Sequence, residues 1–60
     1  MWVLKLFNDP QRKELIAVDK YDYMREIAVM LDCRDYDLYN LYHNRRGRKG
    51  IFQYIEIIKV

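Results

Sequence analysis

The chain has 60 residues, of which 52% are hydrophobic, and a formal net charge of +2, so it forms at most one small domain with a thin core. Cys33 is the only cysteine, which excludes a disulfide within the chain and favours a small core residue. There is no serine or threonine, and the single histidine and the single cysteine are ten positions apart. We therefore expect one domain spanning residues 1–60, without enzymatic activity, metal site or cofactor.

The N-terminal third predicts a β-hairpin. Residues 2–7 alternate and are rich in strand-forming residues, which is typical of a strand. Residues 8–11 predict a turn, because Pro10 presets one backbone angle and Asn8 and Asp9 close turns with side-chain hydrogen bonds. A second short strand is expected over residues 14–18.

The middle of the chain predicts two short helices joined by a tight turn. Between Met24 and Leu31, four apolar residues follow the i, i+3, i+4, i+7 spacing of a buried helical stripe. Either Asp19 or Asp22 is expected to cap the start of this first helix, because a carboxylate suits the positive end of a helix. The first helix is expected to end near Asp32.

The second helix is expected over residues 36–44, after a turn at residues 33–34 and with Asp35 as its N-cap. Leu38 and Leu41 lie on one face of this helix and would form an apolar wedge with the first helix. This spacing is typical of a helix-turn-helix.

The C-terminal part predicts a loop and a long strand. Residues 45–50 contain two glycines and predict the loop, whereas residues 51–60 are β-branched and aromatic and predict the strand. We expect this strand to pair with the strand over residues 2–7. The expected fold class is therefore α+β of order ββααβ, with the N-terminal hairpin and the C-terminal strand in one sheet that packs on the helix pair.

The charge is unevenly distributed, and its basic part follows the second predicted helix. Residues 1–44 carry six Lys/Arg and eight Asp/Glu, whereas residues 45–60 carry five Lys/Arg and one Glu. Such local cationic density favours a polyanionic partner over a merely solvated loop. Neutralisation of phosphates would give a salt-dependent affinity. The residues expected to hold phosphates are Arg45, Arg46, Arg48 and Lys49.

The second predicted helix is a candidate recognition helix for the major groove of duplex DNA. Asn40 carries the amide needed for a two-point contact with adenine, and His43 is the other candidate for a base contact. Tyr36 and Tyr39 are expected to make supporting contacts with bases or phosphates. The two aspartates at the start of this helix count against the hypothesis, because carboxylates repel phosphates.

Residues 20–60 resemble the small helix-turn-helix modules at the tails of phage and intron-encoded homing nucleases and in short phage regulators. The residues that carry the resemblance are 24–31, 38–41, the predicted loop over residues 45–50, called the basic loop below, and 51–54. The resemblance implies a sequence-reading accessory or transcription regulator that binds duplex DNA and is encoded by a phage or mobile element. The chain differs from these modules at Asp32, where a glycine is usual, and at Asp35, where serine or threonine is usual.

Two other classes of function are open. A phage-encoded inhibitor of a host enzyme would use the same tyrosines and arginines as anchors on a protein partner, and a free sheet edge could pair with a partner or form a homodimer. An RNA-contacting ribonucleoprotein subunit is the other alternative. No signal-peptide pattern or membrane-length apolar run is present. We therefore expect no membrane partner and a cytoplasmic location, in the host cytoplasm for a viral protein.

Overall fold

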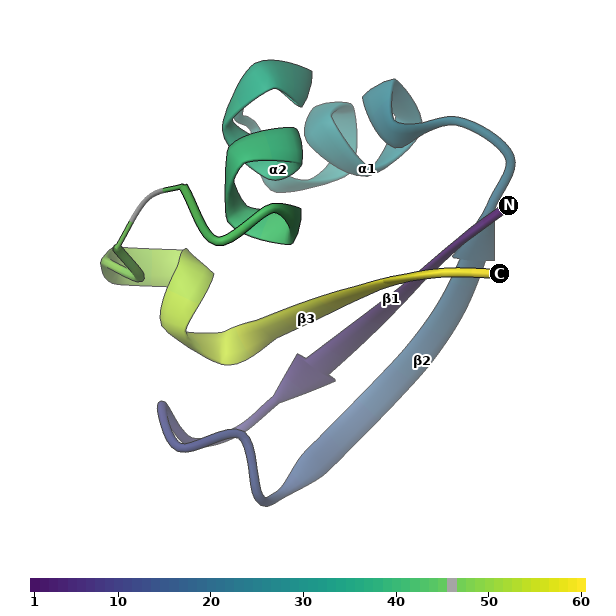
Figure 1. Ribbon diagram of the computed structural model, residues 1–60. Coiled ribbons are helices and arrows are strands. Elements are labelled where there is room, and N and C mark those ends of the chain that lie inside the picture. Colours follow the sequence, from purple (N-terminus) through teal and green to yellow (C-terminus); the bar gives the residue numbers. More distant parts are fainter. Residues whose placement is uncertain (46) are drawn as a thin grey trace.

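The computed structural model of the protein describes residues 1–45 and 47–60 (Figure 1) and has the order ββααβ, with a short 3-10 helix before the last strand. This confirms the predicted fold class and element order. The strands are β1 (Trp2–Phe7), β2 (Leu15–Tyr21) and β3 (Ile55–Lys59). The helices are α1 (Met24–Leu31), α2 (Asp35–Tyr42) and the 3-10 helix η1 (Gly50–Tyr54).

The three strands form one antiparallel sheet in the order β2-β1-β3, so the N-terminal strand is central. Leu4 of β1 lies opposite Asp19 of β2 and Ile57 of β3, and the register with β2 shifts between Leu6 and Phe7. The expected pairing of the C-terminal strand with the N-terminal strand is confirmed. The second strand extends to Tyr21 and is longer than predicted, because β1 offers partners along its whole length.

Both helices, α1 and α2, lie on the same face of the sheet (Figure 1). The hydrophobic core fills the space between the helices and this face. Side chains alternate between the faces of a strand, so Leu4 points toward the helices and is fully buried. Leu31 and Cys33 are partly buried and pack against this core, which agrees with the expected role of the cysteine. The core residues are Trp2, Leu4, Met24, Ile27, Ala28, Leu38, Leu41, Phe52, Ile55 and Ile57.

The opposite face of the sheet carries no helix. Along each strand, the residues of this face alternate with the residues that point into the core. The exposed apolar side chains of Leu15, Val18 and Ile58 lie on this face. Lys5 lies between Val18 and Glu56 in the ladder, so the charged and apolar side chains are mixed on this face. The domain is therefore a two-layer structure with one buried and one open sheet face.

The helix starts differ from the sequence prediction. α1 begins at Met24 with Tyr23 as N-cap and has no side-chain cap, so the predicted cap at Asp19 or Asp22 is wrong. Asp19 is held in β2, and Asp22 precedes the cap position by one residue. α2 begins at Asp35 and ends at Tyr42, with Arg34 as N-cap and no side-chain cap, so the predicted cap at Asp35 is wrong and the helix is shifted from the predicted residues 36–44. The Asp35 Oδ1 accepts a hydrogen bond from the adjacent Tyr36 N–H at 2.8 Å.

The predicted long strand over residues 51–60 is wrong in its first half, which forms η1. β1 ends its pairing with β3 at Leu6 and Ile55, so residues 51–54 have no strand to pair with. Gly50 has a φ of 56°, which favours glycine and redirects the backbone into the 3-10 turn. Phe52 is thereby buried in the core.

Candidate functional site

A three-residue turn joins the helices α1 and α2. Asp32, the C-cap of α1, is left-handed at φ 54° and ψ 49°, a conformation usually filled by glycine. The Cys33 N–H donates to the Ala28 carbonyl at 2.9 Å, which closes the end of the helix. Ile27 and Leu38 are fully buried in the core that both helices share. Asp32 therefore adopts a backbone conformation that favours glycine.

The second helix presents a polar surface away from the core. Tyr36 is 67% exposed, and Asn40 and His43 follow it at positions four and seven residues later, on the same side of the helix. The ring of His43 packs edge-on against Tyr42 with 5.0 Å between ring centroids. The Asn40 carbonyl accepts a hydrogen bond from the Arg45 N–H at 2.8 Å, which ties the start of the basic loop to the helix.

Two of the described cations of the basic loop are exposed. Arg45 and Lys49 are exposed, and the structure gives their side chains no hydrogen bond or ion pair with the described part of the chain. Their charges are therefore available to an external anion. The expected phosphate contact of Arg46 lies outside the described residues.

Arg48 has a structural role that its sequence position did not indicate. Its Nη1 donates to the Phe52 carbonyl at 2.9 Å and to the Ile55 carbonyl at 2.8 Å, so it connects η1 to β3. Burial lowers the pKa of Arg48 from its ordinary value, and the charge of Arg12 lowers it further. Arg48 thus fixes the end of the basic loop on the sheet.

Arg12 belongs to the same end of the molecule, although it lies far away in the sequence. Its Nη1 donates to the Pro10 carbonyl at 3.0 Å and to the Gln53 carbonyl at 3.2 Å. The hairpin turn is thereby attached to η1 and brought near Arg48. Sequence analysis missed this cation because only the folded register brings residues 12 and 53 together.

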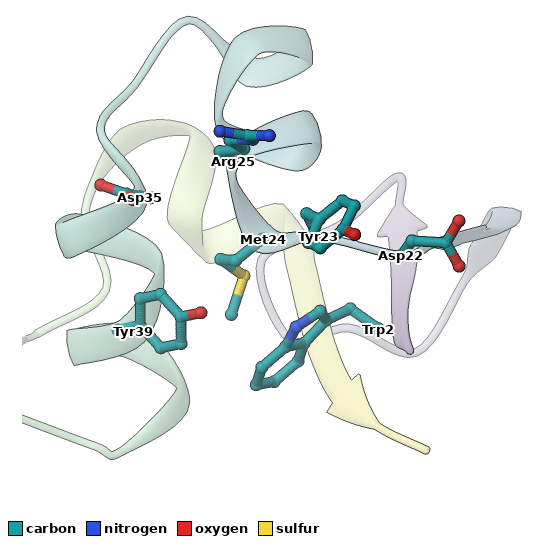
Figure 2. A pocket seen from close by; sticks show the side chains of 7 residues that line it. All are labelled: Trp2, Asp22, Tyr23, Met24, Arg25, Asp35 and Tyr39. Atoms are coloured by element: carbon teal, nitrogen blue, oxygen red, sulfur yellow. The ribbon is translucent and has the colours of Figure 1, made fainter.

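A pocket of about 310 Å³ opens where the start of α1, the start of α2 and the first residue of β1 meet (Figure 2). Sequence analysis predicted only one of its residues, Tyr39, as a functional residue. No spacing rule connects residue 2 with residues 22–25 and 35–39, so the sequence carried no signal for this pocket. It is lined by Trp2, Asp22, Tyr23, Met24, Arg25, Asp35 and Tyr39.

Trp2 forms the floor of this pocket. It is only 8% exposed, and the rings of Tyr39 and Tyr42 meet it edge-on with centroid separations of 5.7 and 5.1 Å. Figure 2 shows the indole nitrogen of Trp2 on the side that faces Met24 and the Tyr39 ring. Within residues 1–45 and 47–60, the structure gives this N–H no hydrogen-bond acceptor.

Tyr39 differs from the other expected contact residues of α2 in its packing. It is 40% exposed and its ring packs on Trp2, although it lies next to Tyr36 and His43 on the helix, three residues after the first and four before the second. Figure 2 shows the Tyr39 hydroxyl directed into the pocket, while the carboxylates of Asp22 and Asp35 lie at its outer edges. The structure thus contains two distinct surfaces, the polar side of α2 with the basic loop and the aromatic pocket.

Comparison of the chain with protein-family models, curated proteins and solved structures gives no match. Among the described residues, no helix has the length and apolarity needed to cross a membrane. The same part of the chain holds no group of three or more His, Cys, Asp or Glu side chains that could bind a metal ion. The functional argument therefore rests on the two surfaces described above.

Proposed function

We propose that this chain is a small non-enzymatic DNA-binding protein of the helix-turn-helix type, a regulator or accessory factor encoded by a phage or mobile element. The observation that carries the proposal is that the polar side of α2 leads directly into a loop whose Arg45 and Lys49 are exposed and unpaired. Exposed cations next to a surface helix are the pattern with which proteins hold the phosphate backbone. Such a protein acts in the cytoplasm, where DNA is accessible.

The turn between the helices supports the helix-turn-helix type. The left-handed Asp32 gives α1 the sharp ending that lets α2 start three residues later. Asp32 has the left-handed conformation in which glycine is usual, so an aspartate at this position is compatible with a tight turn between the helices. In this proposal, Asn40 and His43 contact base edges, and Tyr36 contacts the sugar-phosphate backbone beside them.

The charges on α2 favour its C-terminal half as the side that faces DNA. Asp35 and Asp37 lie in the first turn of α2, where they would repel phosphates. Arg45 and Lys49 lie beyond its last turn, so the helix is negative at its start and is followed by positive charge. A docking orientation with the basic loop on the phosphates keeps the two aspartates away from the backbone.

The proposal is tested by fluorescence anisotropy of a labelled random duplex at several salt concentrations. The double variant Arg45→Ala/Lys49→Ala loses two phosphate contacts, so the slope of log affinity against log salt should fall by about two units. The matched control is Lys5→Ala/Lys20→Ala, which removes the same charge from the sheet face that carries no helix. We expect the control to retain nearly all of the slope.

Three outcomes decide this test. A slope that falls only in the loop variant supports the proposal. Equal loss in both variants would mean that net charge alone attracts DNA, and no binding at low salt would mean that duplex DNA is not the partner. Either of these last two results overturns the proposed phosphate contacts.

A second candidate function, binding to a protein, is favoured by the open face of the sheet. Leu15, Val18 and Ile58 are 51%, 47% and 37% exposed on this face, and β2 is a free edge of the sheet. Exposed apolar side chains among the charged ones of this face, together with a free strand edge, favour protein contacts. A pull-down with Val18→Lys as the control variant would identify a partner that uses this face.

A further inference from the structure

We propose that the aromatic pocket beneath the start of α1 binds an unstacked nucleobase of a nucleic acid strand. This inference rests on the proposed function, because it assumes that nucleic acid reaches this side of the molecule. The ligand class follows from three properties of the pocket. These properties are an unpaired donor on its floor, aromatic walls, and carboxylates at its rim.

The unpaired donor is the indole N–H of Trp2. The residue is 8% exposed and faces the pocket, yet no acceptor from the described part of the chain contacts this nitrogen. A buried donor without a partner is unfavourable, and a ligand that supplies an acceptor removes this cost. The ligand must therefore carry a hydrogen-bond acceptor, which excludes a simple ammonium group. Ring nitrogens and carbonyl oxygens of nucleobases are acceptors of this kind.

The walls of the pocket are suited to a flat ligand. Tyr23 is 60% exposed at one side, and the Tyr39 ring stands at the other side at 85° to the Trp2 ring. Exposed aromatic rings stack on any base, because every base has a π-face. The guanidinium of Arg25 lies over the Tyr23 ring, 5.4 Å from its centroid, which adds a positive charge to this wall.

The rim of the pocket favours a base over a phosphate. The carboxylates of Asp22 and Asp35 flank the opening, and they would repel a phosphate seated inside it. The same carboxylates can accept hydrogen bonds from the amino groups of adenine, cytosine or guanine. The pocket is therefore complementary to a neutral ring with acceptors toward Trp2 and amino groups toward the rim.

The position of the pocket is compatible with simultaneous phosphate contacts. Tyr39 lies one helical turn before the end of α2, and Arg45 follows three residues after that end. One turn of helix is about 5.4 Å long, so a base at Tyr39 and a phosphate at Arg45 can belong to the same strand. The base contact adds to the phosphate contacts and does not compete with them.

The test uses Trp2, the only tryptophan of the chain, as the fluorescent reporter. A single-stranded hexanucleotide of deoxyadenosine is compared with an abasic hexanucleotide that has the same phosphates and no bases. We expect the first to quench Trp2 fluorescence and to bind about tenfold more tightly than the second, as stacking on aromatic residues implies. Tyr23→Ala should remove most of this advantage. The matched control Tyr54→Ala, a partly exposed tyrosine of η1 outside the pocket, should retain it.

The outcomes separate this inference from the proposed function. Equal binding of both oligonucleotides that is lost in Arg45→Ala/Lys49→Ala would overturn the base pocket and leave the phosphate contacts in place. A base-dependent advantage would support the pocket, and it would count against the phosphate contacts only if the double variant bound both oligonucleotides as tightly as the wild-type protein does. Quenching by a lysine-rich peptide without quenching by the hexanucleotide would overturn the inference in favour of a peptide site.

Discussion

Arg45 and Arg48 are neighbours in one loop, but the fold gives them different roles. Arg48 donates through Nη1 to two carbonyls, those of Phe52 and Ile55. Arg45 is exposed, and no described residue pairs with its side chain. We predict that Arg48→Ala lowers the free energy of unfolding by about 2 kcal/mol, because two charge-assisted hydrogen bonds are lost. Arg45→Ala should change it by less than about 0.5 kcal/mol.

Urea unfolding followed by circular dichroism measures the free energy of unfolding of Arg48→Ala and Arg45→Ala. Arg48→Lys is a useful further control, since it keeps the charge but cannot reproduce the guanidinium geometry. A destabilisation of Arg48→Ala no larger than that of Arg45→Ala would contradict the structural role of Arg48.

Asp9 makes the hairpin turn sensitive to pH. Its carboxylate accepts hydrogen bonds from the backbone N–H groups of Glu14, at 2.8 Å, and of Lys13, at 3.0 Å. The Glu14 N–H is the main cause that lowers the pKa of Asp9 below 3.8. A pKa lowered by folding stabilises the protein above the unfolded pKa, and this stabilisation is lost as the pH falls through the folded value.

The variant Asp9→Asn isolates this pH dependence. The wild-type protein should have a higher urea midpoint than Asp9→Asn at pH 7, and the difference should shrink as the pH falls below about 4, near the ordinary pKa of aspartate. Unfolding curves of both proteins across this range measure the difference. A difference that is independent of pH would show that ionisation of Asp9 does not contribute.

At the scale of the elements, the turn between α1 and α2 places an aspartate in a left-handed backbone conformation that glycine adopts more easily. Asp32 adopts φ 54°, where glycine has no Cβ to strain the backbone. We predict that Asp32→Gly raises the free energy of unfolding by about 0.5 to 1 kcal/mol. Val29→Gly, at an exposed position inside α1, should lower it by about 1 kcal/mol. Thermal unfolding distinguishes the two, and a destabilised Asp32→Gly would mean that the aspartate side chain itself supports the turn.

The elements that sequence analysis predicted correctly are those with a strong local pattern. α1 has its apolar stripe from Met24 to Leu31, and β1 has its dense run of strand-forming residues. The segment Ile51–Tyr54 has the same composition as a strand but lacks a partner, because β1 is too short to pair with it. β-strand formation depends on neighbours more than helix formation does. The end of β3 was therefore predictable from composition, whereas its start was not.

The candidate site was predictable only where it is continuous in the sequence. The basic loop and α2 were found because their residues are adjacent along the chain. The pocket was missed, since it combines Trp2 with residues twenty or more positions away. Arg12 was missed because its hydrogen-bond acceptor, the Gln53 carbonyl, is far from it in the sequence. Arg48 is a different case, because its carbonyl partners are only four and seven residues later, at Phe52 and Ile55, and they come within reach because residues 50–54 form η1 where a strand was predicted.

At the scale of the whole molecule, a single core on one side of the sheet holds every element. Leu4 lies at the centre of the central strand and is fully buried under both helices, whereas Leu15 is 51% exposed on the open face of the same sheet. A 60-residue domain buries little apolar surface and has little stability in reserve. Loss of one central side chain should therefore affect the whole fold at once.

Leucine-to-alanine substitutions at these two positions remove the same atoms from the two faces of one sheet. We predict that Leu4→Ala lowers the free energy of unfolding by about 2 to 5 kcal/mol, enough to unfold much of the population at 25 °C, because a cavity remains where the helices meet β1. Leu15→Ala should cost less than about 1 kcal/mol, since water already contacts half of this side chain. Urea unfolding followed in parallel by far-UV circular dichroism and by Trp2 fluorescence measures both effects. If the two probes gave separate transitions in Leu4→Ala, the helices and the sheet would be independent units, and the single shared core would be contradicted.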